Sequence, residues 1–242
     1  MANNVVNRPS FFFVIAIVGL LAVVIGFAKT FFLQMSAGTF MAPLSIYIHG
    51  SFAFAWVILY FVQTTLIHYR KYHVHRTLGI LGLIIAAGLT VTMVPVGLYV
   101  VDRELNQGLG PAAYSTLLGT ITSGIMFFAL VLAGMLKRKK PETHKRLMLL
   151  ATIVVLWPAW FRFRHYFPSV PRPEIWFALV LADSLIVFSW IWDRLKNGVV
   201  HPVLGYGGLL IILEQAFEVI AFDTPPWQMI AKGLYRLLEQ IG

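Results

Sequence analysis

Five of the seven histidines in this sequence lie near the ends of long apolar runs, on the side of the chain where most cations gather: His68, His73, His75, His144 and His201. The densest stretch, TTLIHYRKYHVHRTLGILG at 64–82, holds three of them: His68, His73 and His75. Neutral imidazole ligates transition metals and haem iron, and it can also carry a proton. Histidine next to lysine and arginine also serves as a polar anchor at a membrane surface. Both readings stay open on the sequence alone.

Three histidines each begin an apolar run, in HRTLGILG (His75), HKRLMLLA (His144) and HPVLGYGG (His201). In the last, Pro202 suits the first helical position and puts His201 at the cap. The positive end of a helix dipole disfavours imidazolium, so we expect these histidines to be neutral and able to ligate a metal. Asp193 lies at the same depth. The predicted metal site consists of His75, His144, Asp193 and His201.

A second group of ionisable residues lies inside the apolar runs, where charge is costly and marks either a functional site or a buried pair. Two of them, Asp183 and Glu214, lie about 12 Å from the helix ends at 1.5 Å per residue. Such groups suit proton transfer, catalysis, or binding of an anionic or quinone-like headgroup. The alternative is a set of neutralising pairs, for instance Lys29 with Glu218. The predicted group consists of Lys29, His49, Arg162, Asp183, Glu214 and Glu218.

The composition predicts the elements that position these residues. Hydrophobic residues make up 59% of the 242 positions and charged residues 12%, about half the charged share of a soluble domain. The chain is therefore expected to be an integral membrane protein. It has no cysteine, which excludes disulfides, iron–sulfur clusters and thiolate metal sites. The first apolar run is too long for a signal peptide and is expected to span the membrane.

We predict one all-α domain over 1–242, a seven-helix transmembrane bundle with a short C-terminal interfacial helix. Each predicted span has the roughly 20 residues needed to cross the hydrocarbon layer. The spans are placed at 11–33, 44–68, 76–101, 114–136, 144–164, 174–193 and 202–222. The final stretch, PPWQMIAKGLYRLLEQIG, has apolar residues at helical spacing and should lie along the interface.

The positions of the cations predict orientation and argue against nucleic acid as a partner. The net charge is +9, but most lysines and arginines lie in short loops beside apolar runs. Positive residues favour the cytoplasmic side, and the strongest signal is KRKKPETHKR at 137–146. We therefore expect a multi-pass protein of the inner (plasma) membrane, with a cytoplasmic N-terminus and an external C-terminus.

The motifs HRTLGILG, PETHKRLMLLATI, DRLKNGVVHPVLGYGG and IHGSFAFAWVILYFVQTTL resemble an uncharacterised bacterial family of multi-pass, seven-helix inner-membrane proteins. The resemblance covers nearly the whole chain and implies the fold and location but no reaction. It implies these signature positions: His49, Trp56, Gln63, His75, Arg76, His144, Arg146, Asp193, His201 and Pro202.

A more distant resemblance is to transmembrane b-type cytochromes, which hold one haem near each surface between histidines of different helices. That likeness implies an outer pair, His49 with His165, and an inner pair drawn from His75, His144 and His201. The sequence departs from the pattern because only His49 lies well inside a predicted span, whereas cytochrome ligands lie within helices.

Three functions follow as hypotheses. The first is an oxidoreductase with a histidine-ligated transition metal or haem b, acting on a lipid-soluble substrate such as a quinone. The second is a proton-coupled carrier or small-molecule-binding protein that uses the outer polar residues. The third is an accessory membrane subunit without catalysis. The sequence contains no phosphate-binding G-x-x-x-x-G-K-[ST] loop and no G-x-S-x-G motif.

Overall fold

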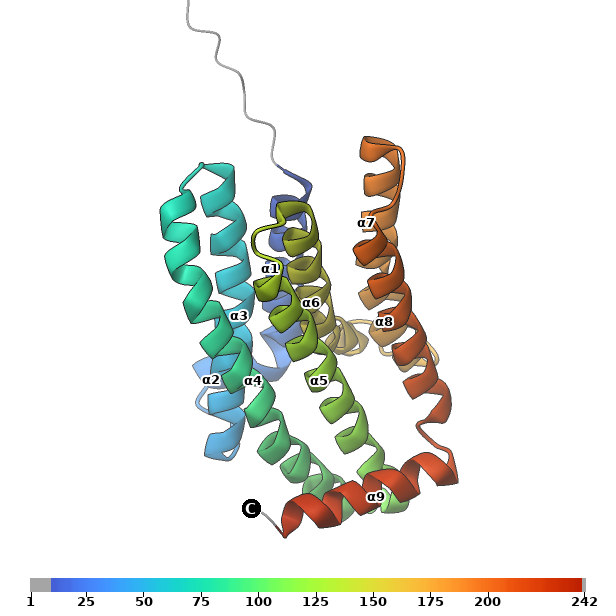
Figure 1. Cartoon of the computed structure of the whole chain (residues 1–242). Helices are drawn as coiled ribbons and strands as arrows, with labels where there is room; N and C mark the ends of the chain where they lie inside the picture. Colours follow the sequence, from blue (N-terminus) through green and yellow to red (C-terminus); the bar gives the residue numbers. More distant parts are fainter. Residues whose placement is uncertain (1–9, 241–242) are drawn as a thin grey trace, which may run out of the picture.

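The computed structural model describes residues 10–240, which form helices joined by short loops, without strands (Figure 1). Several helices continue through a π or 3₁₀ turn. The elements are α1 (Phe11–Phe27) with η1 (Ala28–Phe32) and α2 (Leu33–Ser36); α3 (Leu44–His68); α4 (Tyr72–Asn106); η2 (Gly110–Tyr114) with α5 (Ser115–Leu136); α6 (Pro141–Phe161) with η3 (Arg162–His165); η4 (Glu174–Leu181) with α7 (Ala182–Asn197); α8 (Pro202–Ala221); and α9 (Pro225–Glu239).

Seven of these helical segments are long and apolar enough to cross a membrane, which confirms the predicted all-α fold class. The largest difference from the expected spans is in α4, which covers 35 residues instead of the predicted 76–101. At 1.5 Å per residue this helix is about 52 Å long, more than the ~30 Å hydrocarbon layer needs. The helix therefore continues beyond the apolar run at both ends, through polar residues.

Large apolar side chains on the outer faces of the helices remain exposed in the isolated chain. On α8 they recur at Leu210, Leu213, Phe217 and Ile220, which are 58–77% exposed. This spacing of three or four residues makes one continuous apolar stripe along the helix. A stripe of this kind is stable against lipid tails and costly against water, in agreement with a membrane protein.

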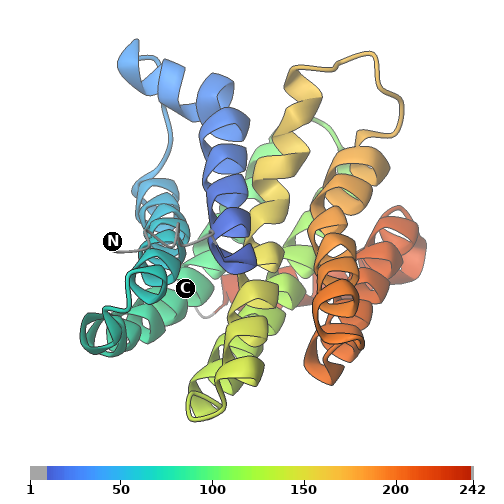
Figure 2. The same ribbon diagram turned by 90° about the horizontal axis from the view of Figure 1, so that it is seen from above.

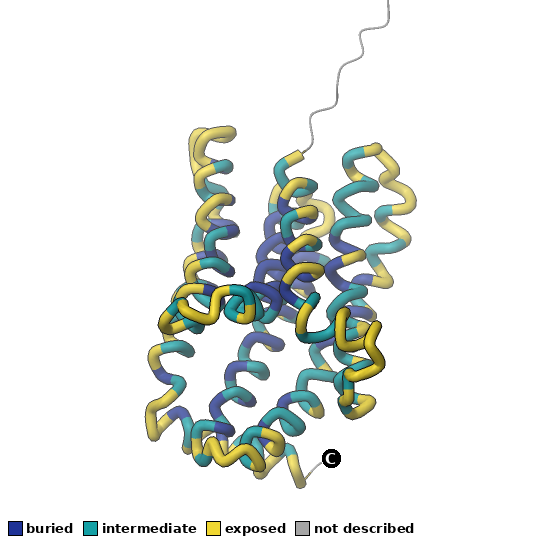
Figure 3. Tube along the Cα trace, turned by 180° about the vertical axis from the view of Figure 1, so that it is seen from behind, coloured by how far each residue is buried: buried dark blue, intermediate teal, exposed yellow. Residues whose placement is uncertain are grey.

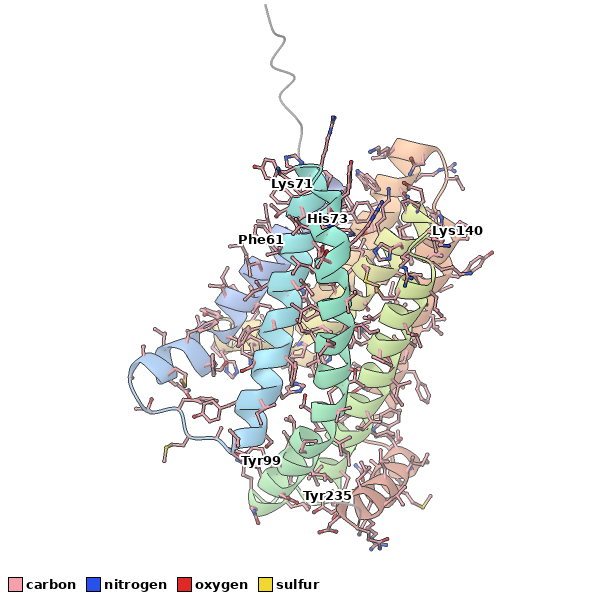
Figure 4. The ribbon with its side chains drawn as sticks, turned by 60° about the vertical axis from the view of Figure 1, so that its left-hand side comes forward. Phe61, Lys71, His73, Tyr99, Lys140 and Tyr235 are labelled. Carbon is pink, nitrogen blue, oxygen red and sulfur yellow. The ribbon has the colours of Figure 1, made fainter. Side chains whose placement is uncertain are left out.

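The two ends of the bundle differ in the segments they carry (Figure 1). The start of α1 and the loops at 69–71, 137–140 and 198–201 lie at one end, which we call the histidine end. The loops that precede α3, α5 and α7 lie toward the opposite side, and α9 crosses the bundle there. We call this second side the α9 end. In Figure 4, Lys71, His73 and Lys140 mark the histidine end, and Tyr99 and Tyr235 mark the α9 end.

Helix α6 is the centre of the bundle, between α1, α5 and α7 when viewed from above (Figure 2). Its residues Leu149, Leu150 and Ile153 are at most 1% exposed. The α1 backbone approaches α6 closely at Gly26, where an added Cβ would lie 2.3 Å from the carbonyl oxygen of Ala159. Small residues permit such contacts between membrane helices. This contact brings the end of α1 beside the end of α6.

Helix α9 is held against α4 and α5 by hydrogen bonds. The Trp227 indole donates to the carbonyl oxygen of Ser115 at 3.4 Å, and the Ser115 hydroxyl donates to that of Phe222 at 2.7 Å. The Tyr235 hydroxyl donates to Asp102 Oδ1 at 2.6 Å, and this contact raises the pKa of Tyr235. The predicted C-terminal helix is therefore present, and it covers the ends of two spans.

The helices fan apart toward the α9 end. Helices α1 and α6 lean to one side of the bundle, whereas α4 and α5 continue to α9 (Figures 1 and 2). Seen from behind, the buried positions gather around the crossing of the central helices, and exposed positions dominate the loops (Figure 3). This divergence places the ionisable residues of α1 and α6 in different surroundings from those of α7 and α8.

Candidate functional site

At the histidine end, the structure brings together two of the predicted ligands, His75 of α4 and His144 of α6. Their ring centroids are 6.4 Å apart, with the ring planes nearly perpendicular. His144 Nδ1 lies 2.8 Å from the carbonyl oxygen of Gly134, so Nδ1 donates the hydrogen, and no hydrogen bond within the described residues uses Nε2. A carbonyl partner of this kind orients ligating histidines in metal sites.

The neighbour of this histidine pair is Gln63 of α3, one of the signature positions. Its Nε2 donates to the carbonyl oxygen of His75 at 3.2 Å. Both Gln63 Oε1 and His75 Nδ1 are buried without a hydrogen-bond partner in the described residues. Two buried polar atoms in the vicinity of the histidine pair therefore have no partner in the described residues.

The other two predicted metal ligands are engaged elsewhere. Asp193 is fully buried and receives hydrogen bonds from both Nε and Nη2 of Arg146, from the Asn197 amide, and from the backbone N–H of His201. Both carboxylate oxygens are thus occupied. Arg146, 2% exposed, also donates to Glu142 Oε2 at 2.7 Å. This buried pair ties α6 to α7 and to the start of α8.

His201 caps α8, as its position before Pro202 predicts. Its Nδ1 accepts a hydrogen bond from the backbone N–H of Val203 at 3.2 Å, which requires that nitrogen to be unprotonated. Burial, reinforced by the positive charge of Arg146, lowers the pKa of His201. A lowered pKa favours the neutral form of His201, in agreement with the expectation from the sequence. The main cause is burial, whereas the sequence argument invoked the helix dipole.

The predicted four-ligand metal site is therefore not assembled. Within residues 10–240, no three histidine or carboxylate side chains are placed to hold a metal ion together. The reason is the Arg146–Asp193 ion pair, which the sequence pattern does not show. His75 and His144 keep free ring nitrogens, while Asp193 and His201 hold the helices together.

The outer group of six residues is divided by the fold into separate places. Lys29 Nζ donates to the carbonyl oxygen of His165 at 3.0 Å and lies 4.3 Å from the centroid of the Tyr166 ring. Arg162 Nε donates to Thr30 Oγ1 at 3.2 Å. Lys29 and Arg162 thus lie together at the ends of α1 and α6. The suggested pair of Lys29 with Glu218 is wrong, because Glu218 packs against α5.

His49 lies apart from both charged groups. Its Nδ1 is 3.0 Å from the Thr92 hydroxyl, which itself donates to the carbonyl oxygen of Gly88 at 2.7 Å. Thr92 therefore accepts from His49 Nδ1, and the lone pair of Nε2 is left free. No hydrogen bond or ring contact in the described part of the chain joins His49 to His165, and the outer haem pair stays a prediction.

Asp183, Glu214 and Glu218 form the third place, which we call the acidic cluster. Asp183 of α7 is 5% exposed, and neither of its carboxyl oxygens has a hydrogen-bond partner in the described residues. Glu214 of α8 lies close enough to both Asp183 and Glu218 for their charges to interact. Glu214 Oε2 is also buried and without a partner. The cluster lies within spans, where such groups are costly.

The Glu218 side chain reaches from α8 to α5. A Cβ added at Gly119 would lie 1.7 Å from Glu218 Oε1, so the carboxyl group occupies the space that the missing side chain leaves. The glycine at 119 thus accommodates a carboxyl group.

Among the described residues, no cation forms an ion pair with the acidic cluster. Every ion pair that the structure gives within residues 10–240 involves other residues: Arg103 with Glu104, Lys145 and Arg146 with Glu142, Arg146 with Asp193, and Arg172 with Glu174. A carboxyl group in such surroundings is stabilised by a proton or by a bound cation. Of the predicted residues, Asp183, Glu214 and Glu218 thus form a group that can bind protons or cations.

The chain was also compared with known protein families, with characterised proteins and with solved structures, and no match was found in any of the three comparisons.

Proposed function

We propose that this membrane protein is a proton-coupled carrier that exchanges protons for a small cationic solute at the acidic cluster. The observation that carries the proposal is the buried carboxyl group of Asp183, whose two oxygens have no hydrogen-bond partner among residues 10–240, beside the partly unpartnered Glu214. Carboxyl groups inside a membrane bundle are typical of proton relays and ion pathways. A purely structural role would be served better by an apolar residue of similar size.

The charge of the transported solute follows from the charges of the acidic cluster. Three carboxyl groups of two helices approach one another, and no ion pair within residues 10–240 joins them to a cation. An anion would be repelled by such a site, whereas protons and cations compete for it. Since only one of the competitors is favoured at a time, binding of a cation releases a proton. That competition is the physical basis of proton–cation exchange.

The first experiment measures this exchange in liposomes that contain the purified protein and a trapped pH indicator. The lumen is acidic, and Na⁺, K⁺ or tetraethylammonium is added outside as the probe cation. We expect one of these cations to raise the lumenal pH, and Asp183→Asn or Glu214→Gln to reduce that rate at least tenfold. Glu174→Gln is the matched control, since Glu174 lies in the same half of the chain but pairs with Arg172.

A second measurement does not depend on the identity of the solute. Dicyclohexylcarbodiimide is an apolar reagent that reacts with protonated carboxyl groups inside membranes. We expect mass spectrometry to find the adduct on Asp183, Glu214 or Glu218 and not on Glu174. Absence of labelling together with absence of cation-driven proton movement would reject the proposal.

The location and orientation belong to the same proposal. We infer an inner-membrane protein with the histidine end in the cytoplasm, because the loop Lys137–Lys140 carries four consecutive cations. The chain has no cysteine, so single cysteines can be introduced without background. Lys139→Cys should resist a membrane-impermeant maleimide in intact cells, and Lys232→Cys on α9 should react. The reverse pattern would invert the orientation.

A second candidate function rests on the histidine pair. The free Nε2 of His144, the unpartnered His75 Nδ1 and the unpartnered Gln63 Oε1 support a metal or haem site of an oxidoreductase, in line with the resemblance to b-type cytochromes. Metal analysis and the visible spectrum of the purified protein test it. A bound metal or a Soret band that is lost in His144→Gln would favour this function, and a colourless, metal-free protein would remove it.

A further inference from the structure

The α9 end carries a second set of uncompensated charges, at the ends of α1 and α6. It consists of Lys29, Arg162 and Arg164, which we call the basic cluster. We propose that the basic cluster is a binding site for a phosphate group, supplied either by an anionic lipid or by a water-soluble phosphate. The site is separate from the acidic cluster and does not depend on the proposed transport function.

Arg162 is held in place by groups that leave its charge unneutralised. Its Nη1 donates to the carbonyl oxygen of Pro158 at 2.7 Å, and its Nε donates to Thr30 Oγ1 at 3.2 Å. The guanidinium carbon lies 4.0 Å from the centroid of the Phe27 ring. These contacts fix the plane of the guanidinium group. Within the described residues, no hydrogen bond uses the remaining nitrogen, Nη2.

Arg164 is also fixed by an aromatic ring and incompletely paired. Its guanidinium carbon lies 3.7 Å from the centroid of the Phe161 ring. Its Nη1 is buried and has no hydrogen-bond partner in the described residues. A buried guanidinium nitrogen without an acceptor is costly, and an oxygen atom of a bound ligand would satisfy it.

The cluster contains positive charges only. Lys29 Nζ lies 3.0 Å from the carbonyl oxygen of His165, and Arg162 and Arg164 belong to the same 3₁₀ turn as His165, so the three cations come from one small region. None of the three forms an ion pair with a described carboxylate. Within residues 10–240, these three positive charges therefore have no counter-ion.

The chemistry of these groups selects the ligand. Guanidinium groups present planar N–H donors that match the oxygens of phosphate, and lysine adds a point charge. The cluster lies at the ends of spans, where lipid headgroups meet the protein. Both a lipid phosphate and a soluble phosphate compound can therefore supply the oxyanion, and the two sources differ in the experiment that detects them.

The test measures thermal unfolding of the full chain in a neutral detergent. The added probes are phosphatidylglycerol, phosphatidylcholine or inorganic phosphate. A ligand present at about 100 times its dissociation constant should raise the midpoint by about 5–10 °C for a chain of this size. We expect this shift with phosphatidylglycerol and not with phosphatidylcholine if the source is lipid. A shift with inorganic phosphate would assign a soluble ligand instead.

The variants decide whether the shift belongs to this site. Arg162→Gln with Arg164→Gln should abolish it, and Arg162→Lys should weaken it, since lysine keeps the charge but loses the planar donors. Arg236→Gln, on the exposed surface of α9, is the matched control and should respond like the wild type. If the double variant unfolds without ligand, native mass spectrometry of Arg164→Gln alone measures the retained lipid or phosphate. No shift with any probe, or a shift that persists in these variants, would overturn the proposal.

Discussion

The histidine end and the α9 end differ in how their buried charges are paired. At the histidine end, Arg146 and Asp193 use almost all of their hydrogen-bonding groups on each other and on neighbouring backbone. At the α9 end, carboxyl groups gather with carboxyl groups, and guanidinium groups gather with an ammonium group. A charge with a built-in partner stabilises a helix contact. A charge whose only neighbours have the same sign requires a proton, an ion or a ligand from outside the chain.

The largest predicted effect concerns the paired end. Arg146→Met should destabilise the protein by about 3–5 kcal/mol, because it leaves the carboxylate of Asp193 buried without its partner. The free energy of unfolding in detergent measures the loss. The double variant Arg146→Met, Asp193→Leu should recover a large part of it, since the uncompensated charge is gone. If the double variant instead loses as much free energy of unfolding as Arg146→Met and Asp193→Leu lose together as single variants, the two residues are not coupled.

The same kind of substitution in the acidic cluster should have the opposite result for stability. Asp183→Asn removes a charge that has no partner, so the free energy of unfolding should stay within about 1 kcal/mol of the wild type or increase. Cation-driven proton movement should nevertheless fall at least tenfold. A loss of stability as large as that of Arg146→Met would show that Asp183 has an undetected partner and would remove the contrast between the ends.

A substitution at Gly119 sharpens the comparison without changing any charge. Gly119→Ala would place a methyl group in the space that Glu218 Oε1 occupies and should displace that carboxyl group. We expect a severalfold decrease in proton movement. Gly79→Ala on α4 is the control, because an added Cβ there meets no atom within 4 Å. Equal effects of the two alanines would argue against a precise position for Glu218.

The smallest predicted effect concerns the exposed bond that holds α9. Tyr235→Phe removes the hydrogen bond to Asp102 and should cost about 0.5–1 kcal/mol. The pKa of Tyr235 is raised in the folded protein, so the stabilisation is complete below the usual tyrosine pKa of about 10 and is lost as the pH rises further. The difference in unfolding midpoint between the variant and the wild type should therefore shrink above pH 10.

The sequence predicted the spans well because a bilayer imposes length and hydropathy on every segment that crosses it. It also predicted that His75, His144 and His201 begin or lie near helix starts at one end, and that α9 exists. It did not predict the Arg146–Asp193 pair. Asp193 was assigned to a metal site on its depth alone, since nothing in a one-dimensional pattern shows which neighbouring helix reaches a carboxylate first.

The outer charges show the same limit. Depth along each helix was available from the residue number, but the rotation of the helix and the lean of the bundle were not. Lys29 and Glu218 lie at similar depth, yet α1 packs with α6, whereas the Glu218 side chain reaches from α8 to Gly119 of α5. The close approach at Gly26 and the space at Gly119 depend on packing between helices distant in the sequence.

The sequence by itself determined that this chain is a bundle of membrane-length helices, and which residues carry charge within them, because hydrophobicity and charge are properties of each segment alone. Only the tertiary structure decided which charges meet. It paired Arg146 with Asp193, left His75 beside His144, and separated the acidic cluster from the basic cluster. The physical reason is that an ionic contact depends on distances of a few ångströms between different helices, and those distances are set by packing.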